Sequence, residues 1–387
     1  MSDLLLRVEE FLAAHDPAAT ERWEFLRARF DAGLARIDWP EGLGGGGLAP
    51  TEQPAVDAAF AAAGAPDNRP SLGIIGLGMA SPAILRYGTR AQQERWLRPL
   101  WTSEEIWCQL FSEPGAGSDL ASLATRAVRD GDDWVVNGQK VWTSLAQHAR
   151  RAILVTRTDP TVPKHDGLTY FVLDMAAPGV EVRPLRQITG EAEFNEVFLT
   201  DVRIPDADRL GAVGEGWAVA MTTLMSERTA IGGGHIPRGA MLGPLLRTWR
   251  SRPELRTAGL HERVLELWVA AEAARIAGAR RRQAQAAGRP GPEGSAAKLS
   301  FSDLNQRITA VETELLGADG LRYADWRPSR AADGSVTDAN RRYLRSRGNS
   351  IEGGTSEILR NIVAERVLGL PPEIRVDKDI AWKDLPR

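Results

Sequence analysis

The apolar residues of this chain change their period twice, and this divides the sequence into three parts. In the first part they recur at the spacing of a helix, from Ile106 they fall into short runs typical of strands, and after Gly214 the helical spacing returns. A helix buries one face at a period of 3.6 residues and a strand at a period of two, so the first and last parts are not expected to form strands, nor the middle part helices. The pattern predicts an α+β protein with an N-terminal helical domain over 1–105, a middle β-domain over 106–212, and a C-terminal helical bundle with a tail over 213–387.

The middle part contains seven stretches expected to form strands: 125–129, 134–136, 140–143, 153–157, 168–174, 180–184 and 195–202. Asn137-Gly138 lies between two of them, and both residues tolerate positive φ, so we expect a hairpin turn there. The four glycines at 44–47 cost too much backbone entropy for a helix or strand and predict a loop. Gly369 and the prolines after it end the last helix, and the tail beyond is expected to run over the surface as a strap.

The composition excludes several classes of function. With a net charge of −3, the chain lacks the basic field that a nucleic-acid partner would need. Its single cysteine, Cys108, cannot form an intrachain disulfide or a cysteine cluster for a metal, and we expect a buried, inert thiol. The histidines show no metal-ligand spacing, so no metal is expected. The N-terminus lacks the pattern of a secretory signal and no run of about eighteen apolar residues occurs, which predicts a cytoplasmic protein without a membrane partner.

The stretch at 109–119, Gln-Leu-Phe-Ser-Glu-Pro-Gly-Ala-Gly-Ser-Asp, consists of small, turn-forming and hydroxyl-bearing residues. Gly115 and Gly117 let a backbone approach a ligand closely at unusual φ and ψ. Ser112 and Ser118 offer hydroxyls that can donate or accept hydrogen bonds. The stretch therefore predicts a ligand-binding turn.

Two later motifs follow this stretch: Lys-Val-Trp-Thr-Ser at 140–144 and Ser-Ile-Glu-Gly-Gly-Thr-Ser-Glu-Ile at 350–358. With all three motifs in this order, the chain resembles the acyl-CoA dehydrogenase family of flavoenzymes over nearly its whole length. The resemblance implies an N-terminal helical domain, a middle β-domain and a C-terminal four-helix bundle, with FAD as the cofactor. Relatives build their flavin sites across dimers and pair the dimers into tetramers, so a homodimer or homotetramer is expected.

Reduction places negative charge on a flavin, so its site needs hydrogen-bond donors that face the electron-accepting edge of the ring. By resemblance, Ser112 would contact the pyrimidine and N5 side, Trp142 would lie against the ring, and Ser144 would bond near N5. A tryptophan in a strand is, however, commonly an ordinary sheet residue. Gly354 and Thr355 match positions that bind the nucleotide at a helix start. Plain capping of that helix is the alternative for Thr355, and the two roles can coexist. The full set that the resemblance implies for FAD is Gln109, Phe111, Ser112, Gly117, Ser118, Trp142, Ser144, Gly354, Thr355 and Glu357.

Dehydrogenation of a thioester also needs a carboxylate that removes the α-proton. The best-known relatives carry it at the position of Gly353, and Glu352, one residue away, would point elsewhere. The isovaleryl-type and long-chain-type branches instead place a glutamate before an arginine on the first helix of the bundle, which matches Glu227 and Arg228. Glu227 falls on a largely apolar stripe of that helix, where desolvation would raise the pKa of a carboxylate. A glutamate on the helix rim, paired with a distant arginine, is the alternative.

The resemblance also assigns substrate contacts. The backbone N–H of Gly353 would donate to the thioester carbonyl, Ser118 would lie near the CoA arm, and Arg228 would support the substrate, although a turn serine bonded to its own backbone fits Ser118 equally well. Two departures affect the adenine end of FAD. Residues 249–256 lack the Arg-x-x-Phe-Gly pattern of relatives, and Glu314 stands where relatives carry glutamine. Either FAD is held differently there or another type of subunit supplies part of the pocket.

The sequence thus predicts an FAD-dependent acyl-CoA dehydrogenase of lipid metabolism and β-oxidation, which makes a trans-2-enoyl-CoA by α-proton abstraction and β-hydride transfer to flavin N5. An electron-transfer flavoprotein is the expected acceptor. Two alternatives stay open: a flavin oxidase or monooxygenase on the same fold, and a subunit that completes the flavin site of a partner in a heteromer. The identity of the acyl group, and CoA as against a carrier-protein thioester, also stay open.

Overall fold

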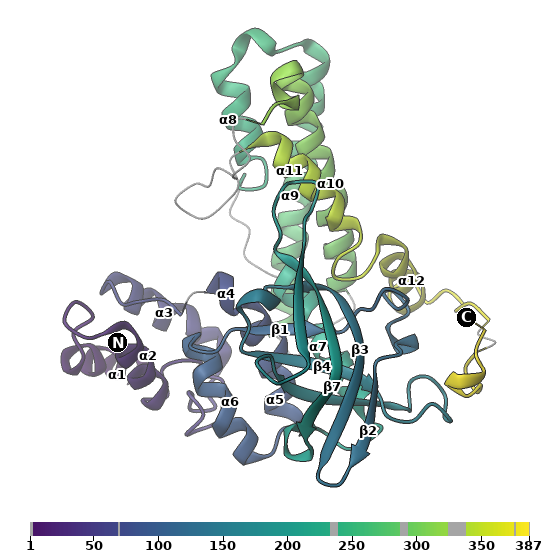
Figure 1. Cartoon of the computed structure of the whole chain (residues 1–387). Coiled ribbons are helices and arrows are strands. Elements are labelled where there is room, and N and C mark those ends of the chain that lie inside the picture. The colour runs from purple at the N-terminus through teal and green to yellow at the C-terminus, as the bar shows by residue number, and fades with distance from the viewer. Residues whose placement is uncertain are drawn as a thin grey trace. The chain divides into compact units, whose positions relative to one another are not determined.

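The computed structural model describes residues 3–68, 70–232, 239–286, 293–323, 338–374 and 377–386. The chain folds into two compact units, whose elements are labelled in Figure 1. The sheet unit comprises Met1–Leu185, Phe194–Ser226 and Val376–Arg387, and the bundle unit comprises Arg186–Glu193 and Glu227–Arg375. The predicted class of helices combined with a sheet is confirmed. The three-domain boundaries at 1–105, 106–212 and 213–387 stay a prediction.

The first part of the sheet unit is helical, as the spacing of its apolar residues predicts. Its helices are α1 (Asp3–Ala14), α2 (Arg22–Asp31), α3 (Gln53–Ala62), α4 (Pro70–Ile75), α5 (Ser81–Tyr87) and α6 (Arg90–Thr102). Phe11, Phe25 and Phe60, one from each of the first three helices, meet edge to face with ring centroids 5.4, 5.7 and 6.1 Å apart. The glycine run is a loop, as predicted. At Gly45 a Cβ would come within 2.2 Å of the Arg36 carbonyl oxygen, so the chain can pass there only as glycine.

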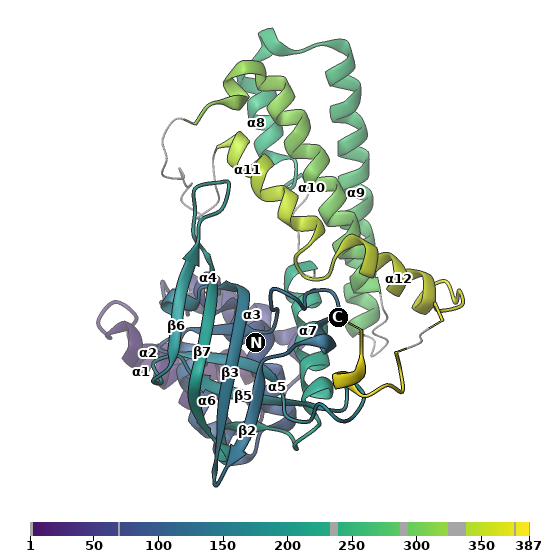
Figure 2. The ribbon, with the colours of Figure 1, turned by 45° about the vertical axis from the view of Figure 1, so that its right-hand side comes forward.

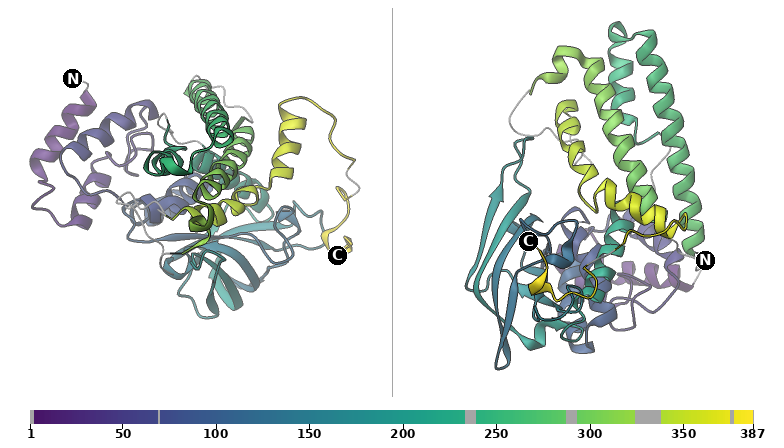
Figure 3. Two further views of the ribbon diagram at one scale, coloured as in Figure 1. Left: turned by 90° about the horizontal axis from the view of Figure 1, so that it is seen from above. Right: turned by 90° about the vertical axis from the view of Figure 1, so that its right-hand side faces the viewer.

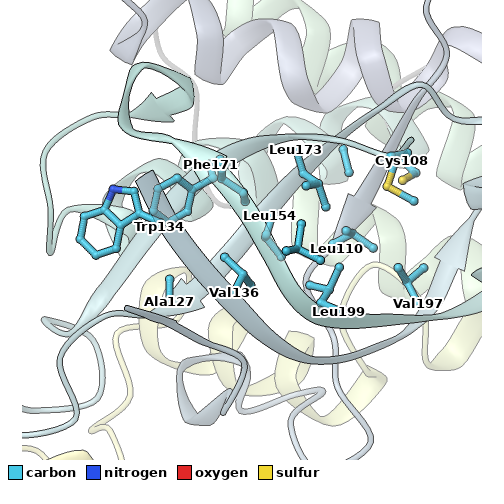
Figure 4. Close-up of a cluster of buried hydrophobic side chains, with 14 of the residues drawn as sticks. Cys108, Leu110, Ala127, Trp134, Val136, Leu154, Phe171, Leu173, Val197 and Leu199 are labelled. Carbon is cyan, nitrogen blue, oxygen red and sulfur yellow. The ribbon is translucent and has the colours of Figure 1, made fainter. Parts of the chain in front are cut away.

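The sheet has the strand order β6-β7-β3-β2-β4-β5-β8, and β1 pairs in parallel with β4. Figure 2 shows β6, β7, β3 and β2 side by side. The strands are β1 (Trp107–Leu110), β2 (Arg126–Asp130), β3 (Asp133–Ser144), β4 (Arg151–Arg157), β5 (Leu168–Asp174), β6 (Val180–Leu185), β7 (Phe194–Pro205) and β8 (Arg209–Leu210). Each expected stretch overlaps one of the strands β2 to β7, although 125–129 begins one residue before β2, and β1 and the two-residue β8 were not among the expected stretches. A core that includes Cys108, Leu110, Trp134, Phe171 and Leu199 covers one face of the sheet (Figure 4).

The predicted hairpin turn at Asn137-Gly138 is wrong. β3 runs through both residues, and its pairing with β7 shifts at an irregularity between Val136 and Gly138. The Asn137 side chain donates to the Asp201 carboxylate (2.9 Å) and accepts from the Asp201 backbone N–H (3.0 Å) on β7. Cross-strand bonds therefore override the local turn preference. The tight turn between β2 and β3 lies instead at Gly131, which has a φ of +63°.

Helix α7 (Gly216–Gly232) begins in the sheet unit, and its residues from Glu227 onward belong to the bundle unit. The bundle unit continues with α8 (Gly243–Ser251), α9 (Ala258–Ala286), α10 (Glu293–Leu316), α11 (Ala339–Ser346) and α12 (Ser356–Arg366). α10 packs against α8, α9, α11 and α12. The long green helices α9 and α10 run side by side in the right-hand view of Figure 3. Within the described residues, no helix is both long enough and apolar enough to cross a membrane.

The tail returns to the sheet unit and runs along its surface, as predicted. Ala381 forms a β-bridge with Pro163, and the Trp382 backbone N–H donates to the Val162 carbonyl (2.9 Å). The Trp382 indole N–H donates to the Ser122 carbonyl (3.2 Å), and the Arg157 guanidinium lies 4.6 Å from the centre of the indole ring. The tail therefore fastens to the 162–163 segment, to Arg157 on β4 and to Ser122, which lies just after the 109–119 stretch.

Candidate active site

The 109–119 stretch leaves strand β1 and closes into a tight turn. Glu113 and Ala116 exchange backbone hydrogen bonds of 2.9 and 3.1 Å, so the chain reverses over Pro114 and Gly115. The predicted unusual φ at Gly115 and Gly117 is wrong, because neither lies in the left-handed region. Both are exposed, and a Cβ at either position would meet nothing within 4 Å. The turn therefore presents bare backbone to whatever binds there.

A buried lysine on β3 anchors this turn through hydrogen bonds. The Lys140 side chain is fully buried and donates to the carbonyls of Phe111 (3.0 Å) and Val155 (2.9 Å) and to the Glu113 carboxylate (2.8 Å). Burial alone raises the pKa of Glu113, but the ammonium of Lys140 and the donors around the carboxylate lower it overall, so Glu113 is ionised. Sequence reasoning assigned no role to Lys140. Its burial could have been predicted, because Lys140 lies six residues after Trp134 on β3, and residues at even spacing along a strand share one face.

Trp142 has an unusual conformation for a residue in a strand. A second irregularity in the β3–β7 pairing lies between Lys140 and Thr143, and Trp142 within it has a φ of +61°. Its side chain is 62% exposed and meets Phe194 edge to face at 6.0 Å. A bulky residue in the left-handed region carries strain of about 1–3 kcal/mol, which is typical of functional positions. Trp142 is therefore presented outward, unlike an ordinary buried strand tryptophan.

The remaining predicted residues of the sheet unit lie close to these elements. The Val141 backbone N–H donates to the Ser112 carbonyl (2.9 Å), which joins the β3 bulge to the start of the turn. Gln109 lies on β1, and Ser144 is the last residue of β3. Gln109, Ser112 and Ser144 are half-buried, Phe111 is buried, and Gly117 and Ser118 are exposed on the turn.

The second group of predicted residues lies in the bundle unit, where a glycine pair precedes α12. Gly353 and Gly354 have φ values of +63° and +96°, a region that residues with side chains avoid. Thr355 caps α12, since its hydroxyl accepts from the Ile358 N–H (3.2 Å), so the capping interpretation of Thr355 is confirmed. Glu357 is exposed in the first turn of the helix. The unpaired N–H groups of such a turn favour an anion.

Glu352 is engaged elsewhere. Its carboxylate forms an ion pair with Arg345 (2.8 Å) and accepts from the Asn349 amide (2.5 Å). Glu227 is half-buried on α7. Of its apolar stripe, Ala220 is buried and Leu224 half-buried, whereas the side chain of Arg228 lies outside the described part of the structure.

Sequence reasoning missed Lys298 on α10. Its side chain is buried, and its ammonium donates to the carbonyls of Asn349 and Gly354, both at 2.7 Å. Burial lowers the pKa of Lys298, while the negative charges of Glu352, Glu227 and Glu357 act in the opposite direction. A lysine among apolar positions of a long helix gave no sequence signal, because its partners lie about fifty residues away.

The departures expected at the adenine end are resolved in part. Both carboxylate oxygens of Glu314 lie 2.7 Å from Arg263, which balances the charge of Glu314. Within 249–256, the Arg256 guanidinium lies 5.4 Å from the centre of the Trp249 ring, which stacks on His261. Contacts within the segment and with His261 and Asp319 hold it, without the phenylalanine and glycine of relatives.

No cluster of metal-ligating side chains occurs among the described residues. Cys108 is buried as expected, and burial raises the pKa of its thiol, which keeps it protonated and unreactive. The side chains described above therefore supply carboxylates, two buried ammonium groups and an exposed indole, and the backbone supplies amides.

Family models for the acyl-CoA dehydrogenase N-terminal, middle and C-terminal domains match residues 6–104, 108–202 and 214–368. The acyl-CoA dehydrogenase IpdE1 of Mycobacterium tuberculosis (strain ATCC 25618 / H37Rv) is 40% identical over 346 residues, which cover 89% of this chain and 86% of that protein. The acyl-CoA dehydrogenase FadE34 of the same organism is 41% identical over 367 residues, which cover 95% of this chain but 49% of FadE34.

Solved structures that share the fold include two assemblies of named protein pairs. The steroid ACAD Tcur3481-Tcur3483 superposes with a TM-score of 0.73 at 26% identity, covering 96% of this chain and 97% of that one. The ChsE4-ChsE5 complex from Mycobacterium tuberculosis superposes with a TM-score of 0.71 at 26% identity, covering 96% and 99%.

Proposed function

Because this chain belongs to the acyl-CoA dehydrogenase family, whose members are FAD-dependent oxidoreductases, we propose that it converts an acyl-CoA thioester to the trans-2-enoyl-CoA with Glu227 as the base. The proposal concerns the mechanism and the individual residues. Membership of the family already implies FAD as the cofactor and an acyl-CoA as the substrate.

The residues present fit FAD on two observations. In the sheet unit, Trp142 is held outward in a strained conformation, and its neighbour Val141 is bonded to Ser112 beside the bare turn. In the bundle unit, Gly354 and Thr355 form an open helix start suited to a pyrophosphate. We assign the ring to Ser112, Trp142 and Ser144, and the nucleotide to the start of α12. Bound FAD would supply the acceptor for the β-hydrogen, which leaves with its electron pair.

The choice of Glu227 rests on the commitment of Glu352 to Arg345 and Asn349 together with the absence of a side chain at Gly353. In the proposed reaction the Glu227 carboxylate takes the α-proton, and the electrons of that C–H bond form the Cα=Cβ double bond as the β C–H bond breaks. The backbone N–H of Gly353 donates to the thioester carbonyl and acidifies the α-position.

For the substrate we infer a bulky, steroid-derived acyl-CoA. The solved relative Tcur3481-Tcur3483 is a steroid ACAD, and this chain resembles it over nearly the whole length of both. An electron-transfer flavoprotein is the proposed acceptor. The altered 249–256 segment, together with the two-protein complexes among the solved relatives, favours a heteromer in which a second chain completes the adenine end of the site.

The test is the visible spectrum of the purified flavoprotein during anaerobic addition of acyl-CoA thioesters with straight, branched and steroid-derived chains. The wild-type flavin should bleach, fastest with its own substrate. Glu227→Gln should keep its flavin and bleach about 10²–10⁴-fold more slowly, because a positioned base contributes that much. Bleaching of Glu227→Gln at the wild-type rate would exclude Glu227 as the base.

The same preparation separates the alternatives. Oxygen consumption during turnover without an added electron acceptor would favour the hypothesis of a flavin oxidase or monooxygenase. A protein that is colourless alone and yellow only with a second chain would favour the shared flavin site.

A further inference from the structure

Lys298 has an unusual position for a helical lysine. Most lysines on helices keep the ammonium in water. The Lys298 side chain is only 1% exposed, and its ammonium donates to two backbone carbonyls, those of Asn349 and Gly354. An ammonium is buried in this way only where its hydrogen bonds compensate for the lost water. The two carbonyls are therefore substantial partners of the charge.

These two carbonyls bracket the segment that contains Gly353. Asn349 lies at one end and Gly354 at the other, so a single ammonium joins both ends of the segment to α10. The glycine pair has no side chain through which neighbouring residues could hold it, and glycine has the largest conformational freedom of any residue. Arg345 and Asn349 hold Glu352 on one side of Gly353, and the ammonium of Lys298 on the Gly354 carbonyl holds the other side.

We propose that Lys298 is a positioning residue: its ammonium fixes the segment from Asn349 to Gly354 so that the Gly353 N–H is held ready to donate to the thioester carbonyl. This inference rests on the proposed function. A donor that is oriented before the reaction stabilises developing negative charge without reorganising, which is the source of its catalytic effect.

The chain offers a matched control on the same helix. The Ser302 hydroxyl also donates to the Asn349 carbonyl, at 2.7 Å. In Ser302→Ala, Lys298 still holds both ends of the segment. In Lys298→Met, Ser302 still holds Asn349, but Gly354 loses the ammonium. The two variants therefore differ in the end of the segment that lies next to Gly353.

The first measurement follows the α-proton alone. A thioester analogue with sulfur at the β-position can lose its α-proton but has no β-hydrogen to transfer, and its carbanion over oxidised flavin produces a broad long-wavelength absorbance. We expect Lys298→Met to keep FAD, to lose this absorbance, and to lower kcat about 10²–10³-fold with little change in KM, as expected when one oxyanion donor is lost. Ser302→Ala should keep both the absorbance and kcat near the wild-type values.

The second measurement requires no activity. Hydrogen exchange of the peptide covering 349–355 should be faster in Lys298→Met than in the wild type and in Ser302→Ala. If Lys298→Met fails to load FAD, Lys298→Gln, which keeps a shorter neutral donor, is measured by the same criteria.

Unchanged exchange at 349–355, or a flavin-loaded Lys298 variant that deprotonates the analogue like the wild type, would overturn the proposal. So would equal losses in the Lys298 and Ser302 variants. A failure of the proposed function looks different: the wild type itself would then neither bleach with any acyl-CoA nor deprotonate the analogue, whatever the exchange of 349–355.

Discussion

At the scale of single residues, Lys140 and Glu113 form a buried ion pair beneath the proposed flavin turn. Removing one member of such a pair costs about 3–5 kcal/mol, because the remaining charge stays buried without a partner. The pair also connects β3 to the turn, since Lys140 binds the carbonyl of Phe111 as well. Its loss would therefore weaken both the fold and the surface to which FAD is assigned.

We predict that Lys140→Met lowers the free energy of unfolding in urea by about 3–5 kcal/mol at neutral pH. The pKa of Glu113 lies below its ordinary value of 4.5 in the folded protein, so the stabilisation is complete above pH 4.5 and is lost as pH falls below it. The difference between variant and wild type should therefore shrink in acid. Adding Glu113→Gln to Lys140→Met should recover part of the loss. A pH-independent difference, or one under 1 kcal/mol, would contradict the role of the pair.

The sequence could identify several site residues but not all of their conformations. The glycine pair at 353–354 indicates a backbone with positive φ, because glycine alone adopts positive φ easily. Trp142 could be assigned only by resemblance, since nothing in a tryptophan predicts a left-handed conformation. The roles of Lys140 and Lys298 were not predicted, because a buried ammonium depends on carbonyls from segments that are distant in the sequence.

At the scale of elements, β3 illustrates how long-range pairing overrides local preference. Asn137-Gly138 is a strong turn signal, yet β7 pairs with β3 on both sides of it. Gly138 is needed for packing: a Cβ there would lie 2.3 Å from the Thr125 hydroxyl and 2.8 Å from its Cα. The sequence indicated correctly that position 138 requires glycine. The reason is the close approach of Thr125, and the chain does not reverse there.

We predict that Gly138→Ala destabilises the sheet unit by about 1–3 kcal/mol, the usual cost of forcing an extra carbon into a packed site. The control is Gly46→Ala in the same unit, where a Cβ would come no closer than 3.8 Å to a neighbour. Urea unfolding followed by tryptophan fluorescence measures both variants. Equal stabilities for the two variants would show that the chain relaxes around position 138.

At the scale of the whole molecule, the order of helical and strand regions followed from apolar periodicity, because most segments bury one face. The division into two units did not follow. Residues 377–386 join the sheet unit and Arg186–Glu193 joins the bundle unit, and both assignments depend on contacts between segments far apart in the chain. Periodicity contains no information on such contacts.

The tail supplies a prediction at this scale. Trp382→Ala removes the indole from Arg157 and the N–H from the Ser122 carbonyl, which should cost about 1–3 kcal/mol. Hydrogen exchange at 119–124 and 159–166 should increase. Lys383→Ala is the matched control, because its contact with Pro160 is made through the backbone. If both variants exchange alike, the indole does not anchor the tail.

The tail also fixes an order of events during biosynthesis. A ribosome makes residues 1–185 early, but Trp382 and its neighbours emerge only after the entire bundle unit has been made. Until then Arg157 and the Ser122 carbonyl lack the indole they contact in the finished protein. The sheet unit therefore keeps this surface uncovered while about 150 residues of the bundle unit are translated.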